Sequence, residues 1–373
     1  MDENQLNKEF EELYVKKLAP RIVPLEQERV VVDQISNRNK FIGFLCFVGS
    51  FIGVWLTQNL YCFVLVVPAI IMFSIEKKRQ NKFRLKLKQQ LLMEIFSLFG
   101  TFQYCTGKEL ITKKEIMKTG LFPKCDHKRD NDSIIGTYNG MHIAIVETEL
   151  THTEIDYSDD SHDQHNVIKD FRGLIIKTVL NKPYTGRILL YQKAIGQKGQ
   201  KQAIKSMLSE EVGEEQADKI VNSKTVNAIT GVLAFKEKPL LKKLNISGNG
   251  LNIDLNSEIH VDKNLNKVTL EDPEFSQFYD VYSDDQVEAR YILTPTFIER
   301  LKNIREVIGA FHVHCYVENQ CITLFIENPR DFFEIGSFNE SINNKKIYQD
   351  IFVQLITIFN LIHYFKLDKK LGL

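Results

Sequence analysis

The pattern of apolar and polar positions changes several times along the chain, and its most extreme part is residues 41–75. These 35 positions contain no charged side chain. As one straight helix they would measure about 52 Å, far more than a hydrocarbon core of about 30 Å. The letters TQN at positions 57–59 interrupt the stretch. The pattern therefore predicts a transmembrane helical hairpin with arms at residues 41–57 and 60–75. The alternative is a buried hairpin in a soluble protein.

Basic residues flank both arms of this hairpin. Arg38 and Lys40 precede the first arm, and a cluster follows the second: Lys77, Lys78, Arg79, Lys82 and Arg84. Positive residues favour the cytoplasmic side, so we expect a multi-pass inner-membrane protein with both termini in the cytoplasm. Gly49 and Gly53 form a G-x-x-x-G motif on the first arm, which suits close helix packing against either the second arm or a second copy of the chain.

Helical periodicity continues on both sides of the hairpin. Within residues 1–40, Leu6, Phe10, Leu13 and Leu18 share one face and predict a cytoplasmic amphipathic helix that ends at Pro20. Residues 76–119 predict juxtamembrane basic helices. The first is the basic stretch 76–90, and the second covers residues 107–119 and ends at Gly120.

After residue 120 the spacing of apolar residues changes from the helical period to the two-residue period of a strand. Asn139-Gly140 lies between two strand-like runs and predicts a hairpin turn. Further strand-like runs follow up to about residue 192, and residues 258–271 also read as strand. A possible insertion at 198–257 interrupts them. Its first part, 198–222, is polar and helix-prone, and strand-like and turn-rich segments follow. Residues 120–373 thus predict a cytoplasmic α+β domain with a mixed, mainly antiparallel sheet and packed helices.

The last eighty residues carry the clearest local signals. Thr294-Pro295 predicts the start of a helix that ends at Gly309, and the runs FHVHCYV and CITLFI predict a hairpin around a short ENQ turn. Residues 347–365 are apolar over most of their circumference. Three polar side chains within them favour a buried core helix over a third membrane span: Gln354, Asn360 and His363.

Two polar clusters are candidates for chemistry. The stretch VYSDDQVEARYILTP at 281–295 contains Asp284, Asp285, Glu288 and Arg290. The spacing of Asp285 and Glu288 is typical of a capped helix start, with Arg290 as an ion-pair partner, so a structural corner is the simpler interpretation and a binding or catalytic site the alternative.

The second cluster lies in residues 149–167, where three histidines occur among aspartates: His152, His162 and His165. They are candidate metal ligands, although a solvated loop explains the same composition. His312 and His314 alternate along a predicted strand and are expected on a wet sheet face rather than at a metal.

Composition narrows the function classes. Lys plus Arg equals Asp plus Glu at 48 each, so no net field attracts nucleic acid. The six cysteines form no C-x-x-C pair, which argues against a zinc ribbon or a redox motif. The glycine-rich phosphate and dinucleotide motifs, H-E-x-x-H and G-x-S-x-G do not occur. We therefore expect no cofactor.

Four motifs together resemble a bacterial family of membrane-anchored proteins described as a domain of unknown function. They are GLF at 120–122, FRGL at 171–174, LEDPEF at 270–275 and the full 281–295 stretch. The resemblance extends from about residue 10 to 365 and leaves out 198–257. It implies a two-span inner-membrane protein with a cytoplasmic α+β domain, and it brings no activity, cofactor or catalytic residue.

The sequence thus favours a membrane-anchored binding or scaffold module over an enzyme. Its expected partners are the lipid bilayer, a protein of unknown identity and a second copy of the chain. The alternative is a metal-dependent enzyme or sensor that uses the loop 152–165 or the carboxylates Asp284, Asp285 and Glu288.

Overall fold

The computed structural model describes residues 3–57, 61, 66–156, 164–180, 184–193, 259–328, 331–335 and 340–367. The chain divides into two compact units. The sheet unit consists mainly of residues 100–332 and 353–373, and the helical unit of residues 2–99 and 333–352. The predicted insertion at 198–257 lies outside the described residues.

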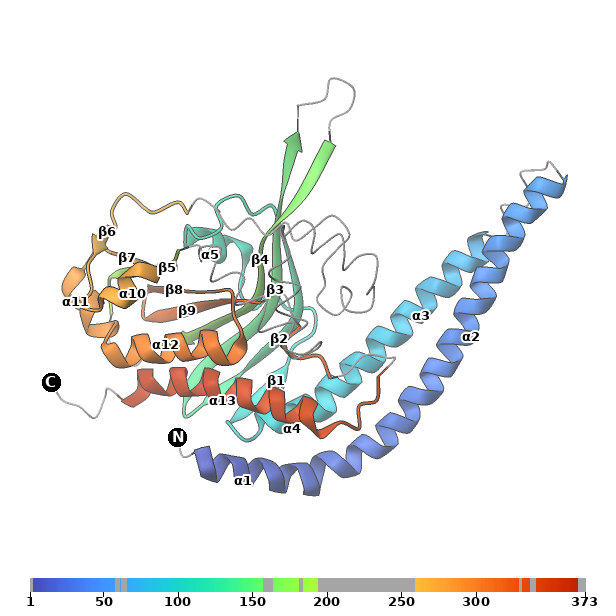
Figure 1. Ribbon diagram of the computed structural model, residues 1–373, viewed down its shortest axis with the longest axis horizontal. Helices are drawn as coiled ribbons and strands as arrows, with labels where there is room; N and C mark the ends of the chain where they lie inside the picture. Colours follow the sequence, from blue (N-terminus) through green and yellow to red (C-terminus); the bar gives the residue numbers. More distant parts are fainter. Residues whose placement is uncertain are drawn as a thin grey trace, which may run out of the picture. The chain divides into compact units, whose positions relative to one another are not determined.

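The sheet unit is built on nine strands within the described residues, and every neighbouring pair in the order β1-β2-β3-β4-β9-β8-β5-β7-β6 is antiparallel (Figure 1). The strands are β1 (Thr101–Tyr104), β2 (His127–Tyr138), β3 (Met141–Asp156), β4 (Gln164–Val179), β5 (Arg187–Gln192), β6 (Asn266–Val268), β7 (Tyr279–Ser283), β8 (His312–Glu318) and β9 (Cys321–Glu327). The helices are α5 (Lys113–Lys118), α10 (Pro273–Phe278), α11 (Gln286–Ile292), α12 (Pro295–Ile308) and α13 (Lys345–Leu367), of which the first part belongs to the helical unit. The predicted α+β class is confirmed.

Several predicted turns and caps are confirmed. Asn139 and Gly140 both have positive φ, 51° and 82°, and join β2 to β3 in the way a two-residue hairpin requires. Asn319 and Gln320 do the same between β8 and β9. The Thr294 hydroxyl accepts the backbone N–H of Phe297 at 3.3 Å, which caps α12.

Both faces of the sheet are covered, so side chains of alternate parity are buried on opposite sides. Val146 and Leu150 of β3 point to the face that carries α5 and belong to the main core cluster. On the other face the Phe359 ring of α13 packs against the rings of Phe102 and Tyr138 at centroid distances of 5.4 and 4.8 Å. Figure 1 shows α12 and α13 on this second face. The apolar 347–365 run is therefore a buried helix, as predicted.

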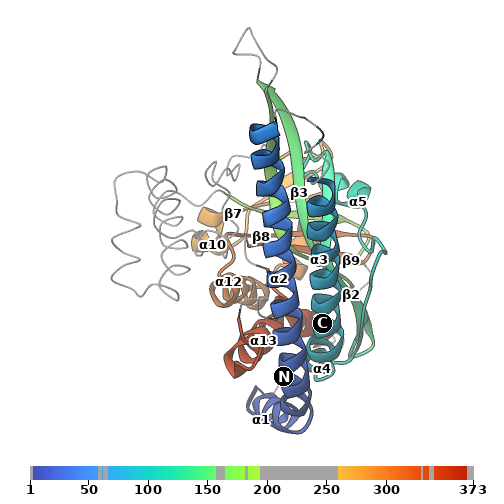
Figure 2. The same cartoon turned by 90° about the vertical axis from the view of Figure 1, so that its right-hand side faces the viewer.

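The helical unit is dominated by two long helices. Its elements are α1 (Glu3–Leu13), a π-helical turn (Tyr14–Leu18), α2 (Ala19–Thr57), α3 (Val66–Leu87), a second π-helical turn (Lys88–Leu92) and α4 (Met93–Phe96). Figures 1 and 2 both show α2 and α3 side by side. Three polar pairs fix an antiparallel register: Asn39 with Glu76 at 2.6 Å, Ser36 with Gln80 at 3.0 Å, and Glu28 with Lys86 at 2.5 Å.

Three local predictions were wrong. The first helix does not end at Pro20 but continues into α2, which also contains Pro24. The π-helical turn directly before α2 changes the backbone hydrogen bonding, so the missing proline N–H falls where the regular ladder is already interrupted. The helix expected at 107–119 is only the short α5, which Thr112 caps. In the described part of 258–271 only Asn266–Val268 is strand.

Among the described residues, one helix is long and apolar enough to cross a membrane. It runs from Asn4 to Leu56 through α1, the π-helical turn and α2, and only 11% of its most apolar window is buried inside the protein. A helix of a soluble core would be mostly buried.

Candidate functional site

The predicted corner at 281–295 is a set of local contacts. Asp285 caps α11 by accepting the backbone N–H groups of Val287 and Glu288, each at 2.9 Å. The N–H of Asp285 itself donates to the Ser283 hydroxyl at 3.0 Å rather than to a Glu288 carboxylate. Asp285 therefore caps the helix as a capping box predicts, but the Ser283 hydroxyl takes the role expected of the Glu288 carboxylate.

The neighbouring Asp284 joins this corner to β5. Its carboxylate accepts the backbone N–H of Arg187 at 2.6 Å and the Arg187 Nε–H at 3.1 Å. Arg187 also donates to Asp262 at 2.6 Å. The backbone N–H of Asn264, and then this arginine, lower the pKa of the Asp262 carboxyl. Arg290 lies 3.4 Å from the carbonyl oxygen of Thr269. These contacts hold three segments together.

Of the three loop histidines, the structure describes the side chain of His152. His152 is buried, and its Nδ1 lies 2.6 Å from Asp170 Oδ1 while its Nε2 lies 3.3 Å from Glu154 Oε1. His165 pairs with Ile155, three positions farther along the β3–β4 ladder, which corresponds to about 10 Å. His162 lies outside the described residues. Within the described part of the chain, no group of three or more His, Cys, Asp or Glu side chains could hold a metal ion.

Asp170 lies on the same sheet face as His152, because it is two positions along β4 from Ile168, the partner of His152. The β3–β4 register shifts between Leu150 and Thr151, so Asp170 has no opposite residue while Phe171 pairs with Leu150. An extra residue of this kind turns its side chain toward the face of its neighbour. The hydrogen bond from His152 is also the leading cause that lowers the pKa of Glu154. Sequence reasoning missed the His152–Asp170 pair because neither segment specifies the register of β3 against β4.

The second histidine pair corrects an expectation. His312 and His314 do not lie on a wet face, because each is only 6% exposed. His312 Nδ1 lies 2.6 Å from Glu327 Oε2 on β9. His314 Nδ1 accepts the backbone N–H of Gln192 at 3.1 Å, and its ring stacks on Tyr191 at a centroid distance of 5.1 Å. Both faces of the sheet are covered at these strands. The alternation of polar and apolar residues along a strand therefore does not tell whether the polar face is exposed to solvent.

His314 and Gln192 extend the ladder between β5 and β8 past its last regular pair, Leu190 with Cys315. The Gln192 side-chain oxygen accepts the backbone N–H of Val313 at 2.7 Å, in exchange for the N–H that Gln192 gives to His314. Burial, and then the nearby His312, lower the pKa of His314 well below its ordinary value. His314 is therefore a neutral acceptor that joins two strands.

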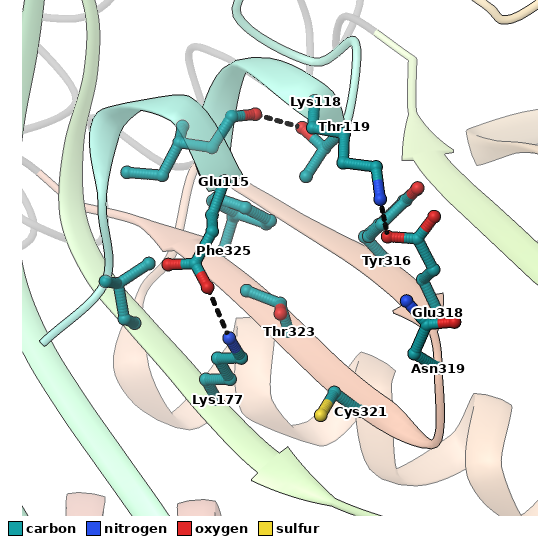
Figure 3. A pocket seen from close by; sticks show the side chains of 12 residues that line it. Glu115, Lys118, Thr119, Lys177, Tyr316, Glu318, Asn319, Cys321, Thr323 and Phe325 are labelled. Atoms are coloured by element: carbon teal, nitrogen blue, oxygen red, sulfur yellow. Dashed lines mark hydrogen bonds and ion pairs between the residues drawn. The ribbon is translucent and has the colours of Figure 1, made fainter.

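A pocket of about 200 Å³ opens between α5 and the β8–β9 hairpin (Figure 3). It is lined by Ile111, Glu115, Ile116, Lys118, Thr119, Lys177, Tyr316, Glu318, Asn319, Cys321, Thr323 and Phe325. Its apolar part belongs to the main core cluster, through Ile111, Ile116, Tyr316 and Phe325. Burial, followed by the charge of Glu318, raises the pKa of the Tyr316 hydroxyl, so this group stays protonated.

Two ion pairs form the polar rim of the pocket. Lys177 Nζ of β4 lies 2.8 Å from Glu115 Oε1 of α5, and Lys118 Nζ of α5 lies 2.6 Å from Glu318 Oε2 of β8. Figure 3 shows the pairs on opposite sides, with Thr323 and Cys321 between them. The hydrogen bond from Lys177 and the backbone N–H of Thr112 lower the pKa of the Glu115 carboxyl despite its partial burial.

The sequence did not indicate this pocket, because its residues come from three separate segments. One local feature that positions it is Gly120, whose φ of 75° ends the α5 segment. A Cβ there would lie 2.1 Å from the His260 carbonyl oxygen, so only glycine permits this approach. The GLF motif is thus explained at its first residue by backbone packing.

Gly49 and Gly53 lie on α2, the first arm. A side chain placed at Gly49 would meet no atom within 4 Å in the described part of the chain. The positions of α2 that are fully buried nearby are Ser36 and Ser50. The close approach to α3 therefore involves these serines rather than Gly49.

The family described as "Protein of unknown function (DUF3137)" matches residues 169–367, which is more than half of the chain. The chain belongs to this family. The region matched to DUF3137 runs from β4 to the end of α13 and includes Asp170, the corner at 281–295 and the His312–Glu327 pair.

Other comparisons add little to the DUF3137 assignment. No curated protein is significantly similar in sequence to the chain. The crystal structure of the mycobacterial trehalose monomycolate transport factor A, TtfA, is 11% identical and aligns with 70% of this chain and 86% of that chain at a TM-score of 0.29. This likeness is too distant to show a shared fold.

Proposed function

We propose that the protein is a membrane-anchored binding or scaffold module whose helices α2 and α3 cross the bilayer as a hairpin. The observation that carries this proposal is the exposure of large apolar side chains on both helices. Trp55 and Leu56 are 75% and 67% exposed. Within the apolar stretch 41–75, the others exposed on α2 and α3 are Phe41, Ile42, Phe44, Leu45, Phe47, Phe51, Ile52, Val67, Ile70, Ile71, Phe73 and Ile75. In water such a surface is unfavourable, whereas in lipid it is the ordinary surface of a membrane helix.

The register of α2 against α3 supports a hairpin with two matched arms. The three polar pairs between the helices, at 39 with 76, 36 with 80 and 28 with 86, are each centred on about residue 57 or 58 of the chain. The apolar stretch 41–75 is centred at the same place. Each arm therefore starts at the same level and rises by about 25 Å, close to the hydrocarbon thickness.

Polar side chains mark the level at which the apolar stretch begins on both helices. Glu76 is 2% exposed and accepts hydrogen bonds from Asn39 at 2.6 Å and from Arg79 at 2.9 Å. A buried carboxylate needs such donors near a membrane boundary. The basic residues that follow Glu76 favour the cytoplasmic side. We therefore propose that both termini and the sheet unit lie in the cytoplasm at an inner membrane.

Binding rather than catalysis is the role that we assign to the sheet unit. The carboxylates of the 281–295 corner cap a helix and pair with Arg187, and the buried histidines pair with acids or with backbone. These contacts use the polar groups for structure. We propose that the pocket beside α5 and the outer surface of the sheet unit bind a ligand or a protein partner. The bilayer and a second copy of the chain are the other partners in this proposal, and nucleic acid is not one.

Membrane insertion is tested by placing a charge on α2. Phe51, which is 50% exposed, is replaced by arginine, and Val287 of α11, which is 76% exposed, receives the same substitution as a control. Arginine near the middle of a span costs about 3 kcal/mol of insertion free energy. We expect the parent and Val287→Arg to stay in the membrane pellet after carbonate extraction and Phe51→Arg to be partly released. Release of the parent itself would refute the proposal.

Topology is tested separately with reporters fused at the C-terminus. A fluorescent protein that matures only in the cytoplasm is expected to be active, and alkaline phosphatase, which needs the periplasm, is expected to be inactive. The opposite pattern would contradict a two-span hairpin with cytoplasmic ends.

A further inference from the structure

The polar rim of the pocket has an arrangement of charges that suits one class of small molecule. Glu115 and Lys118 lie one turn apart on α5, and the sheet presents Lys177 and Glu318 opposite them. Two positive and two negative groups therefore alternate around the opening, and the net formal charge is zero. A phosphate or a polyamine gains nothing from such a rim, whereas a molecule with one positive and one negative group can contact both kinds of side chain.

The ion pairs already present at the rim do not prevent a ligand with one positive and one negative group from binding there. Lys118 is 57% exposed and Glu115 46%, so both pairs are open to water on one side. Exposed pairs of this kind contribute little to stability, and exchange of one partner for a ligand is therefore inexpensive. The ligand's ammonium group would replace a lysine beside a glutamate, and its carboxylate would replace a glutamate beside a lysine.

The size and inner wall of the pocket narrow the class further. About 200 Å³ is less than the volume of most sites for drug-sized ligands and somewhat more than the cavity of about 150 Å³ that holds a benzene molecule. The inner wall is formed by the Tyr316 ring of the core cluster with Cys321 and Thr323, and the buried side chains of Ile111, Ile116 and Phe325 lie beneath it. This volume fits one branched aliphatic side chain together with its charged head.

We infer that the pocket binds a free α-amino acid with an aliphatic side chain, its two charged groups lying across the rim and its side chain against the core cluster. This inference deepens the proposed function and rests on its binding part, but it does not depend on membrane insertion. A failure to bind an amino acid leaves the carbonate-extraction result untouched, and a soluble chain could still bind one.

Cys321 gives a direct readout of occupancy because its half-buried thiol lines the pocket, while the half-buried thiol of Cys105 on the same unit does not. The full-length protein in detergent is alkylated slowly, and modification of each thiol is followed by peptide mass spectrometry. The probes are L-leucine, 4-methylpentanoate, which lacks the ammonium group, and 3-methylbutylamine, which lacks the carboxylate.

We expect leucine to protect Cys321 in a saturable manner and to leave Cys105 unchanged. The two singly charged probes should need concentrations at least about tenfold higher, since each lacks one charge-assisted hydrogen bond. The inference is overturned if leucine gives no protection, if all three probes protect equally, or if Cys105 is protected in parallel.

A matched pair of variants tests whether the charged side chains of the rim bind leucine. Lys177→Met removes one rim lysine, and Lys169→Met removes another β4 lysine that pairs with a glutamate, Glu149, outside the pocket at 3.2 Å. We expect the leucine concentration for half protection to rise at least about tenfold in Lys177→Met and to stay unchanged in Lys169→Met. Glu318→Gln should weaken binding in the same way from the opposite side of the rim. Equal behaviour of the two lysine variants would overturn the assignment.

Discussion

Replacement of His314 by asparagine is expected to remove a pH dependence from the stability of β8. The His314 Nδ1 accepts the backbone N–H of Gln192 at 3.1 Å, so a proton can be added there only if that bond breaks. Burial and the neighbouring His312 ring, at a centroid distance of 5.8 Å, lower the pKa of His314 well below its ordinary value of 6.5. An asparagine side-chain oxygen takes the position of Nδ1 and accepts the same N–H without titrating.

The sign and size follow from proton binding. Below about pH 6.5 the unfolded chain protonates His314 and the folded chain does not, so stability falls as the pH falls. Between the ordinary pKa and the lowered pKa of the folded state the slope is about 1.4 kcal/mol per pH unit, which amounts to at most about 2 kcal/mol between pH 7 and pH 5. The loss continues until the pH reaches the lowered pKa of the folded state. His312 and its partner Glu327 are present in both proteins and cancel in the comparison.

Hydrogen exchange of the β8 peptide in detergent measures this without global unfolding. Protection factors at several pH values, corrected for intrinsic exchange, give the free energy of opening of the strand. We expect that free energy to fall more in the parent than in His314→Asn between pH 7 and pH 5, by up to about 2 kcal/mol. The variant starts from a lower value because it loses the stack on Tyr191. Identical pH dependence in the two proteins would refute the reasoning.

Four further substitutions test the sheet unit, each by urea denaturation of the purified protein. Asp285→Ala removes the acceptor of two N–H groups and should cost about 1 kcal/mol, whereas Glu288→Ala should change stability by less than about 0.5 kcal/mol. Gly173→Ala places a Cβ 2.0 Å from the carbonyl oxygen of Ile326, which a paired strand cannot accommodate, and should cost more than about 3 kcal/mol. Phe359→Ala removes a fully buried ring and should cost about 3–5 kcal/mol.

Controls are available for each of these substitutions. Val353 lies on the same helix as Phe359 but is 46% exposed, so Val353→Ala should stay within about 0.5 kcal/mol of the parent. Gly49→Ala meets no atom within 4 Å and should not destabilise the sheet unit. Equal effects of Asp285→Ala and Glu288→Ala would contradict the capping role, and a fully stable Gly173→Ala would contradict the strand register.

Local features of the fold were predictable because their causes are local. Asn139-Gly140 adopts positive φ at both positions, and Thr294-Pro295 caps and starts α12, since each depends only on the residues quoted. The core helix at 347–365 followed from the polar side chains within an apolar run. Family membership was predictable for the same reason, because the motif stretch 281–295 is contiguous and lies inside the matched region.

Features that depend on distant pairing were not predictable. The placement of β5 beside β8 brings Gln192 to His314, 122 positions apart, and nothing in either segment specifies the partner. The bulge at Asp170 and the two histidine–carboxylate pairs also depend on which strands pair and in which register. The pocket combines α5 with the β8–β9 turn, and its ion pair from Lys118 to Glu318 spans 200 positions. Periodicity identifies elements and faces but not which elements meet.

The most direct test of the membrane hairpin uses Trp55, the only tryptophan of the chain, whose side chain is 75% exposed on α2. The protein is reconstituted into vesicles that contain lipids with brominated acyl chains, and the fluorescence of Trp55 is compared with that in unbrominated vesicles and in the presence of aqueous acrylamide. If α2 lies in the bilayer, brominated lipid quenches the emission strongly and acrylamide has little effect. Strong quenching by acrylamide with no effect of the brominated lipid would place α2 in water and contradict the proposed anchor.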